Sequence, residues 1–255
     1  MALDCSALGV TTWTLPVRGV GALEWASARE LGLVHFDRRD LEMYDSPVVL
    51  RDAANALGIK LGALAMYELE RLGIEDVTRA HRIIDEDIDL AVALGVTYVY
   101  LPSFNAAEIR DRNGLIRTAE LLSYALDSTD ALTVASENSL SGSQNIELFG
   151  LVNNRRLRLL YDTQNPVLFG LHPGVLASQT AHLIGRYVHV KDGIAGEGDA
   201  VVGCGMADVR ATLAILCRAG FTGEFVFEGA YRTYGSSRLI ADVNGLDLAL
   251  SACRQ

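Results

Sequence analysis

The feature that most constrains the fold is a unit that repeats eight times along the chain. Each unit has a short apolar run, then a polar or glycine-containing break, then a longer segment with helical spacing of apolar residues. Runs such as LTVAS, RLLY and YVHV are apolar on both sides, which favours parallel strands covered on both faces. The predicted strands are residues 8–13, 34–38, 60–66, 98–101, 132–136, 158–161, 187–190 and 224–228.

Two segments between the predicted strands show the helical pattern clearly. Apolar residues recur at helical spacing over 77–91 and over 209–216, and Gly95 and Gly220 follow as stop signals. No linker is visible, and 255 residues are close to the ~250 that are typical of one barrel. We therefore predict one domain over residues 1–255, a single (β/α)8 TIM barrel of the α/β class, with a doubly wound open sheet as the alternative.

Charge and cysteine content exclude several classes of protein. With 32 acidic and 22 basic residues, the net charge of −10 argues against a nucleic-acid partner. The four cysteines are scattered without a C-x-x-C pair, which favours reduced thiols over a disulfide framework or a thiolate zinc site. The start of the chain lacks the pattern of a secretory signal, and no apolar run approaches the roughly 20 residues of a membrane span. We expect a cytoplasmic protein without a membrane segment.

Four predicted strands end in residues that can ligate a metal ion. Glu137, Asp162, His189 and Glu228 stand at or near the carboxyl ends of the last four strands, where the active site of a (β/α)8 barrel lies. Three carboxylates packed closely there would repel one another, and a divalent cation removes that repulsion. Three oxygen donors and one imidazole suit Mn²⁺, Mg²⁺ or Co²⁺ better than a soft-ligand zinc site, and we favour Mn²⁺.

The runs that carry these residues also carry a family resemblance. In order they are ENSLSG, YDTQNP, YVHVKDG, GCGMADV and FVFEG. Together they resemble the xylose isomerase-like TIM-barrel superfamily, in its sugar phosphate isomerase/epimerase branch, over essentially the whole chain. In members such as ketose 3-epimerases, two glutamates, one aspartate and one histidine bind the cation. The resemblance implies that Glu137, Asp162, His189 and Glu228 do so here, with a small sugar or sugar-derived molecule as substrate.

The resemblance also implies the chemistry, in which the metal holds adjacent sugar oxygens and the two glutamates flank the carbon between them. Removal of a proton α to a carbonyl at neutral pH needs a cation to stabilise the enediolate oxygen and a carboxylate within reach. Glu137 and Glu228 are the predicted acid/base pair. Return of the proton by the second glutamate gives epimerisation, and return to the neighbouring carbon by the same group gives isomerisation.

Two departures from the family pattern argue against close identity with the ketose 3-epimerases. Asn165 stands where ketose 3-epimerases usually carry a histidine, and no arginine follows six residues after His189. The DNA-repair endonuclease branch needs a three-zinc cluster with additional histidines. The five histidines of this chain and its net charge of −10 argue against that branch.

Lys191 and Asp192 directly follow the His189 strand and resemble the H-x-K-D run of inosose dehydratases. Because side chains alternate along a strand, His189 and Lys191 point to the same side, and Lys191 is a predicted catalytic residue that polarises a carbonyl or orients a carboxylate. A sugar dehydratase is therefore the second enzymatic hypothesis. A non-catalytic sugar-binding barrel is the third, and the sequence leaves homo-oligomerisation open.

Other residues near strand ends keep two interpretations. Trp13, Tyr67 and Arg39 would contact the sugar or an anionic group, or else pack the barrel. Gly203 and Gly205 would present backbone N–H groups to an anion, but a single G-x-G is weak evidence of a phosphate site.

Two of the histidines are assigned ordinary structural roles. His81 is predicted to pack between helices, and His172 to lie on a surface loop. The side of the strand on which His35 lies depends on the register of that strand.

Overall fold

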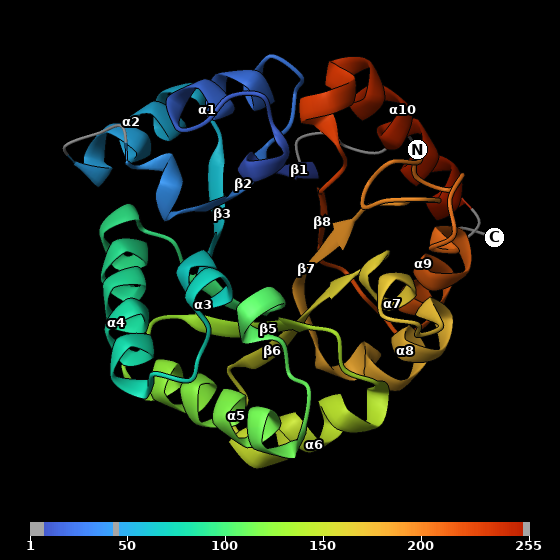
Figure 1. Cartoon of the computed structure of the whole chain (residues 1–255). Coiled ribbons are helices and arrows are strands. Elements are labelled where there is room, and N and C mark those ends of the chain that lie inside the picture. Colours follow the sequence, from blue (N-terminus) through green and yellow to red (C-terminus); the bar gives the residue numbers. More distant parts are fainter. Residues whose placement is uncertain (1–7, 43–45, 252–255) are drawn as a thin grey trace.

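Eight parallel strands pair in chain order, and β1 pairs with β8, so that the sheet closes into a barrel (Figure 1). The structure, a computed structural model, describes residues 8–42 and 46–251. The strands are β1 (Leu8–Thr11), β2 (Leu33–Asp37), β3 (Lys60–Ala65), β4 (Tyr98–Ser103), β5 (Thr133–Asn138), β6 (Leu157–Asp162), β7 (Ile184–Val190) and β8 (Glu224–Phe227). The predicted (β/α)8 barrel is confirmed, and the alternative of an open sheet is wrong.

Helices follow the strands and surround the barrel (Figure 1). They are α1 (Val20–Ser27), α2 (Pro47–Leu57), α3 (Tyr67–Leu72), α4 (Val77–Leu94), α5 (Arg112–Asp127), α6 (Gly142–Val152), α7 (Asn165–Leu168), α8 (Pro173–Thr180), α9 (Val209–Arg218) and α10 (Tyr231–Ser251). Short 3₁₀ turns occupy Thr12–Thr14, Arg38–Asp40, Asn105–Ala107 and Ala181–Leu183. Within residues 8–42 and 46–251, no helix combines the length and the apolar character needed to cross a bilayer.

Helix α4 illustrates how the sequence sets the bounds of an element. The Asp76 side chain caps its N-terminus by accepting a hydrogen bond from the backbone N–H of Arg79, at 3.0 Å. Gly95 ends the helix in the left-handed conformation, with φ of 73°, which a glycine adopts without strain. Between these signals, Ile84 and Ile88 lie on the buried face. The segment that the apolar spacing predicted as helical is therefore a helix with both ends specified.

Strand ends at the barrel mouth differ from the prediction by a few residues. β1 ends at Thr11, and the chain then enters a 3₁₀ turn that contains Trp13. β8 ends at Phe227, so Glu228 follows the strand, although its backbone N–H still bonds to the Val190 carbonyl of β7 at 3.0 Å. β4 continues to Ser103 because it remains paired with β5 to its end. These shifts leave the candidate residues at the same mouth of the barrel.

The barrel interior is filled by side chains that alternate with those facing the helices. Apolar residues of the inner layers include Leu33, Tyr98, Leu160 and Tyr187, whereas the larger core lies between the strands and the outer helices. At the carboxyl ends of the strands the inward positions become polar. The apolar inner layers therefore lie below a ring of polar side chains at the carboxyl-terminal mouth of the barrel.

Candidate metal centre and active site

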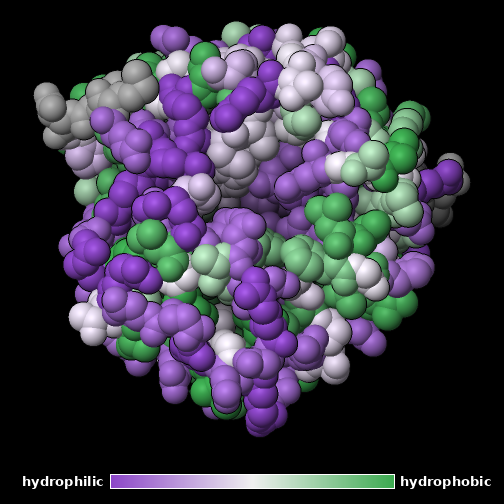
Figure 2. Space-filling view, in the orientation of Figure 1, coloured by the Kyte–Doolittle hydropathy of each residue, from purple (hydrophilic) through white to green (hydrophobic). Residues whose placement is uncertain are grey.

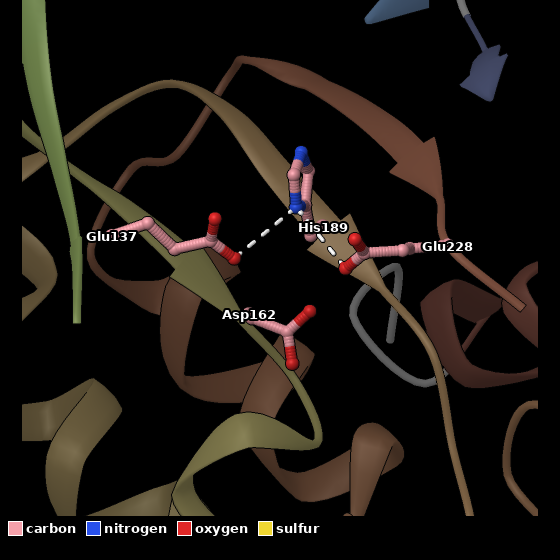
Figure 3. Close-up of side chains that lie close together, drawn as sticks. All are labelled: Glu137, Asp162, His189 and Glu228. Atoms are coloured by element: carbon pink, nitrogen blue, oxygen red, sulfur yellow. Dashed lines mark ion pairs between the residues drawn. The ribbon is translucent and has the colours of Figure 1, made fainter. Parts of the chain in front are cut away.

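The barrel mouth gathers four side chains from four neighbouring strands. Glu137 lies near the end of β5, Asp162 ends β6, His189 lies near the end of β7, and Glu228 directly follows β8. One potential ligand atom of each residue lies within 4.8 Å of the others, and the side chains point toward one another (Figure 3). The four residues predicted as metal ligands therefore lie together, in an arrangement that could hold one cation.

His189 lies at the centre of this cluster and is fully buried. Its Nδ1 atom is 3.4 Å from Oε1 of Glu137 and 3.4 Å from Oε2 of Glu228 (Figure 3). Burial alone would lower the pKa of the imidazole, but the two carboxylates outweigh it and raise the pKa of His189 to about 10. Negative charge therefore dominates the potential at this nitrogen.

Two buried ligand atoms in the cluster lack a hydrogen-bond partner among the described residues, Nδ1 of His189 and Oδ2 of Asp162. The other oxygen of Asp162 accepts the backbone N–H groups of Gln164, at 2.8 Å, and of Asn165, at 2.6 Å, which orients the carboxylate. Buried polar atoms normally have partners, so these two atoms need an explanation. Carboxylate oxygens with one imidazole nitrogen are the donor set of a divalent cation such as Mn²⁺ or Mg²⁺, and the residues fit such an ion.

Lys191 lies beside the cluster, and only 2% of it is exposed. Its Nζ atom donates to Oε2 of Glu228 at 2.9 Å and to Glu197, and forms an ion pair with Oδ2 of Asp162 at 3.5 Å. Burial opposes ionisation of Glu228, but Lys191 and His189 outweigh it and lower the pKa of that carboxyl. Burial, opposed by Lys191, raises the pKa of the Asp162 carboxyl to about 7.

A cavity of about 490 Å³ opens onto the cluster. In Figure 2 it is seen as a hollow near the centre of the face, bordered largely by hydrophilic residues. One wall is apolar, where Phe104 and Phe169 stack with their ring centres 5.6 Å apart and Leu168 lies alongside. The lining residues are Trp13, Asp37, Arg39, Ala65, Tyr67, Glu70, Tyr100, Pro102, Phe104, Asn105, Glu108, Arg110, Glu137, Asn165, Leu168, Phe169, Lys191, Glu197 and Glu228.

The sequence interpretation missed several acidic residues of the cavity, among them Glu70 and Glu197. Glu70 lies on α3 and accepts a hydrogen bond from the side chain of Asn105. Burial, together with repulsion from the other carboxylates, raises the pKa of Glu70 to about 7. Glu197 lies in the loop after β7 and contacts Lys191. Neither residue stands at a strand end, so no strand pattern could have identified them.

Trp13, Arg39 and Tyr67 all line the cavity. The indole N–H of Trp13 donates to Oε1 of Glu228 at 2.7 Å, so this residue also holds a member of the cluster. The Arg39 guanidinium carbon lies 3.5 Å from the centre of the Tyr67 ring, and its nitrogens bond to Asp37. Trp13 is thus tied directly to the cluster, whereas Arg39 and Tyr67 form part of the rim.

Asn165 bonds to two members of the cluster. Its backbone N–H donates to Asp162, and its side-chain Nδ2 donates to Oε1 of Glu137 at 3.3 Å. An amide nitrogen next to a carboxylate orients that carboxylate without adding charge. Asn165 therefore positions Glu137.

The G-x-G sequence already has a partner for its N–H groups. The backbone N–H groups of Gly203 and Gly205 both donate to Oδ2 of Asp192, at 3.0 and 2.9 Å. These donors are therefore not available to an anionic ligand. Asp192, which follows Lys191, organises the loop after β7.

The two histidines assigned ordinary roles lie outside the cavity. His81 stacks on the Tyr124 ring of α5 with ring centres 3.7 Å apart, as expected for a residue that packs between helices. His172 is exposed at the N-terminal end of α8, in agreement with a surface position.

Comparisons with known proteins agree on the architecture. Residues 19–247 match the family model described as xylose isomerase-like TIM barrel. A curated protein from Actinoplanes sp., 2-epi-5-epi-valiolone 7-phosphate 2-epimerase, is 32% identical over 248 residues, which cover 92% of this chain and 92% of that protein.

Solved structures of similar fold include an L-ribulose 3-epimerase and D-psicose 3-epimerase from Clostridium cellulolyticum. The first has a TM-score of 0.77 at 18% identity and covers 97% of this chain and 95% of that one. The second has a TM-score of 0.71 at 14% identity and covers 97% and 98%. At these identities the likeness concerns the fold.

Proposed function

The chain belongs to the xylose isomerase-like TIM-barrel family, and from this premise we propose that it is a divalent-metal-dependent epimerase or isomerase of a sugar or sugar-derived ketone. The observation that carries the proposal is the cluster of Glu137, Asp162, His189 and Glu228, whose ligand atoms lie within 4.8 Å of one another beneath a cavity. The name of the 32% identical relative, a 2-epimerase, supports the reaction class.

We assign the metal to the four residues of the cluster, with Mn²⁺ as the favoured ion. Bound there, a divalent cation would stabilise the negative charge that develops on substrate oxygens when the neighbouring carbon loses a proton. The remaining step is the transfer of that proton, which side chains of the protein would carry out.

The two glutamates have environments suited to moving a proton between opposite sides of a substrate. Glu137 and Glu228 extend into the cluster from opposite sides of His189 (Figure 3). Asn165 holds Oε1 of Glu137, and Trp13 and Lys191 hold the two oxygens of Glu228. We propose that one glutamate, as a carboxylate, removes the proton, and that the other, as a carboxylic acid, donates its own proton to the opposite face, which inverts the carbon. Return to the adjacent carbon by a single carboxylate would isomerise the substrate instead.

Metal loading tests the proposal directly. After dialysis against Mn²⁺ and removal of free ion, elemental analysis is expected to find about one Mn²⁺ per chain. At a free concentration 100 times Kd, the ion should stabilise the fold by about 2.7 kcal/mol, which corresponds to a rise in Tm of roughly 5–10 °C for a chain of this size. Asp162→Asn should lose most of both effects.

A matched control is Asp76→Asn, which replaces the acidic cap of α4, a residue that does not line the cavity, by an equally good cap. It should bind Mn²⁺ like the wild type. Wild-type protein that retains no Mn²⁺ after loading would contradict the proposal.

The charge of the cavity predicts which substrates are favoured. Three basic residues line it, and each is paired with an acidic residue of the same cavity: Arg39 with Asp37, Arg110 with Glu108, and Lys191 with Glu228. Three further acidic residues, Glu70, Glu137 and Glu197, also line the cavity. A free ketose should therefore exchange its proton with solvent deuterium faster than its phosphate ester, by at least about tenfold, which corresponds to roughly 1.4 kcal/mol.

The Glu70→Gln variant tests whether cavity charge sets this preference. It removes an acidic group and should reduce the ratio of the exchange rate of the free ketose to that of its phosphate ester. Glu68→Gln, on the same helix but paired with Arg71 outside the cavity, should leave the ratio unchanged. Faster exchange of the phosphate ester by the wild type would contradict the prediction.

Dehydration is the second candidate reaction, because the Lys191 ammonium group lies next to a proposed base. Nζ of Lys191 bonds to Glu228, and Lys191 lines the cavity, so this residue would serve as the proton donor for a departing hydroxyl group. A product lighter than the substrate by one water, detected by mass spectrometry, would favour this reaction over epimerisation.

A further inference from the structure

His35, a fully buried residue of β2, contacts the cluster from inside the barrel. Its Nδ1 atom lies 3.0 Å from Nε2 of His189, the ring nitrogen that faces away from the carboxylates. The His35 ring is held edge-on against Tyr187, with ring centres 4.6 Å apart, and lies 5.9 Å from the Tyr100 ring. The ring is therefore fixed by packing as well as by the contact with His189.

The backbone around His35 is adapted to this position. The pairing of β2 with β3 shifts register between Val34 and His35, an irregularity that re-aims a side chain. On β3, Gly62 leaves the space that the ring occupies, because a Cβ there would lie 3.2 Å from Cδ2 of His35. Two local departures from a regular strand pair thus favour one orientation of one imidazole.

Metal binding at Nδ1 of His189 would fix the positions of the hydrogen atoms on both rings. Nδ1 of His189 faces Glu137 and Glu228, and a metal-ligating nitrogen carries no proton. The proton of neutral, metal-bound His189 would then be on Nε2, 3.0 Å from Nδ1 of His35, to which it would donate. His35 carries its own proton on Nε2, an atom without a hydrogen-bond partner among the described residues. An unpaired buried donor reduces stability, so its presence needs a reason.

We propose that His35 is a positioning residue, which fixes the tautomer and ring orientation of His189 so that Nδ1 is presented to the metal. Carboxylates, backbone carbonyls and waters commonly orient a metal-binding histidine, and here an imidazole occupies that place. A neutral acceptor adds no negative charge to a site that already holds three carboxylates. The inference rests on the proposed metal site.

Imidazole nitrogen spectroscopy tests the tautomer without a substrate. In uniformly ¹⁵N-labelled protein loaded with Mg²⁺, which is diamagnetic, the five histidines give few signals to assign. We expect a proton on Nε2 of His189, none on its Nδ1, and a coupling across the N–H···N hydrogen bond to Nδ1 of His35. A proton attached to Nδ1 of His35, with Nε2 of His189 as the acceptor, would overturn the proposal.

Variants of His35 test its effect on the affinity for the metal ion. His35→Phe keeps an aromatic ring without the acceptor and should weaken Mn²⁺ binding by about 10–100-fold. His35→Asn, whose Oδ1 can replace the accepting Nδ1, should stay within a few-fold of the wild type. The matched control Tyr98→Phe removes a buried hydroxyl group that has no partner among the described residues, and it should bind Mn²⁺ normally.

The outcomes separate this inference from the function on which it rests. Wild-type affinity in a folded His35→Phe protein would remove the role of His35 and leave the metal site intact. Failure of the wild type to retain Mn²⁺ would instead remove the proposed function. If His35→Phe does not fold, the wild-type spectrum and the His35→Asn affinity still decide the question.

Discussion

In the Glu228→Gln variant, uptake of solvent deuterium by a ketose in the presence of Mn²⁺ is expected to fall by about 10²–10⁴-fold. The amide has nearly the same shape as the carboxylate and can still accept the hydrogen bond from Trp13. It cannot take a proton from carbon, and it places no negative charge beside Lys191 and His189. The exchange rate, followed by mass spectrometry or NMR, measures the proton transfer itself.

Strand β8 offers a matched control at its other end. Glu224 begins this strand at the opposite mouth of the barrel, where it pairs with Lys60 and Arg186. Glu224→Gln should exchange the substrate proton like the wild type. Unchanged exchange in a folded Glu228→Gln protein would exclude Glu228 from the reaction.

The largest expected effect on stability comes from Asp192, of which 1% is exposed. Its Oδ1 accepts the backbone N–H groups of Gly193 and Ala207, and its Oδ2 accepts those of Gly203 and Gly205. In Asp192→Asn, an NH₂ group faces two N–H donors in place of Oδ2. Loss of these two charge-assisted hydrogen bonds should reduce the free energy of unfolding by about 2–4 kcal/mol, measured from urea unfolding.

The loop that Asp192 organises also carries Glu197, which contacts Lys191. Asp192→Asn should therefore reduce the exchange rate as well as the stability. Asp199→Asn is the matched control, because Asp199 accepts backbone N–H groups of Ile194 and Ala195 in the same loop but is only half-buried. A larger loss of stability in Asp199→Asn than in Asp192→Asn would contradict the role of Asp192.

The eightfold repeat of strand and helix patterns was sufficient to predict the barrel. The positions of four side chains at strand ends were sufficient to predict that they lie close together. Strand ends in a closed parallel barrel all face one mouth, so Glu137, Asp162 and Glu228 could be expected together once the strands were assigned. Alternation along β7 likewise predicted that His189 and Lys191 share a side, and both lie in or beside the cluster. The roles of these residues remain proposals that the experiments above test.

The positions of His35, Glu70 and Glu197 depend on features that a linear pattern does not contain. The orientation of His35 follows from a register shift and from a glycine on the neighbouring strand. Glu70 and Glu197 reach the cavity from α3 and from a loop, and loop paths are set by long-range contacts. Gly203 and Gly205 looked free because their partner, Asp192, lies more than ten residues earlier in the chain.

The hydrogen bond between Trp13 and Glu228 joins residues 215 positions apart in sequence, next to the seam where β1 meets β8. Such a contact forms only when the first and the last strand of the barrel are both present. Contacts of large sequence separation are also slow to form. A chain that ends before β8 contains the other three residues of the cluster, Glu137, Asp162 and His189, but lacks Glu228. Because Glu228 is a proposed metal ligand and proton-transfer group, activity is expected to require β8 and closure of the ring, and a truncated chain that lacks β8 should be inactive even where its remaining strands are folded.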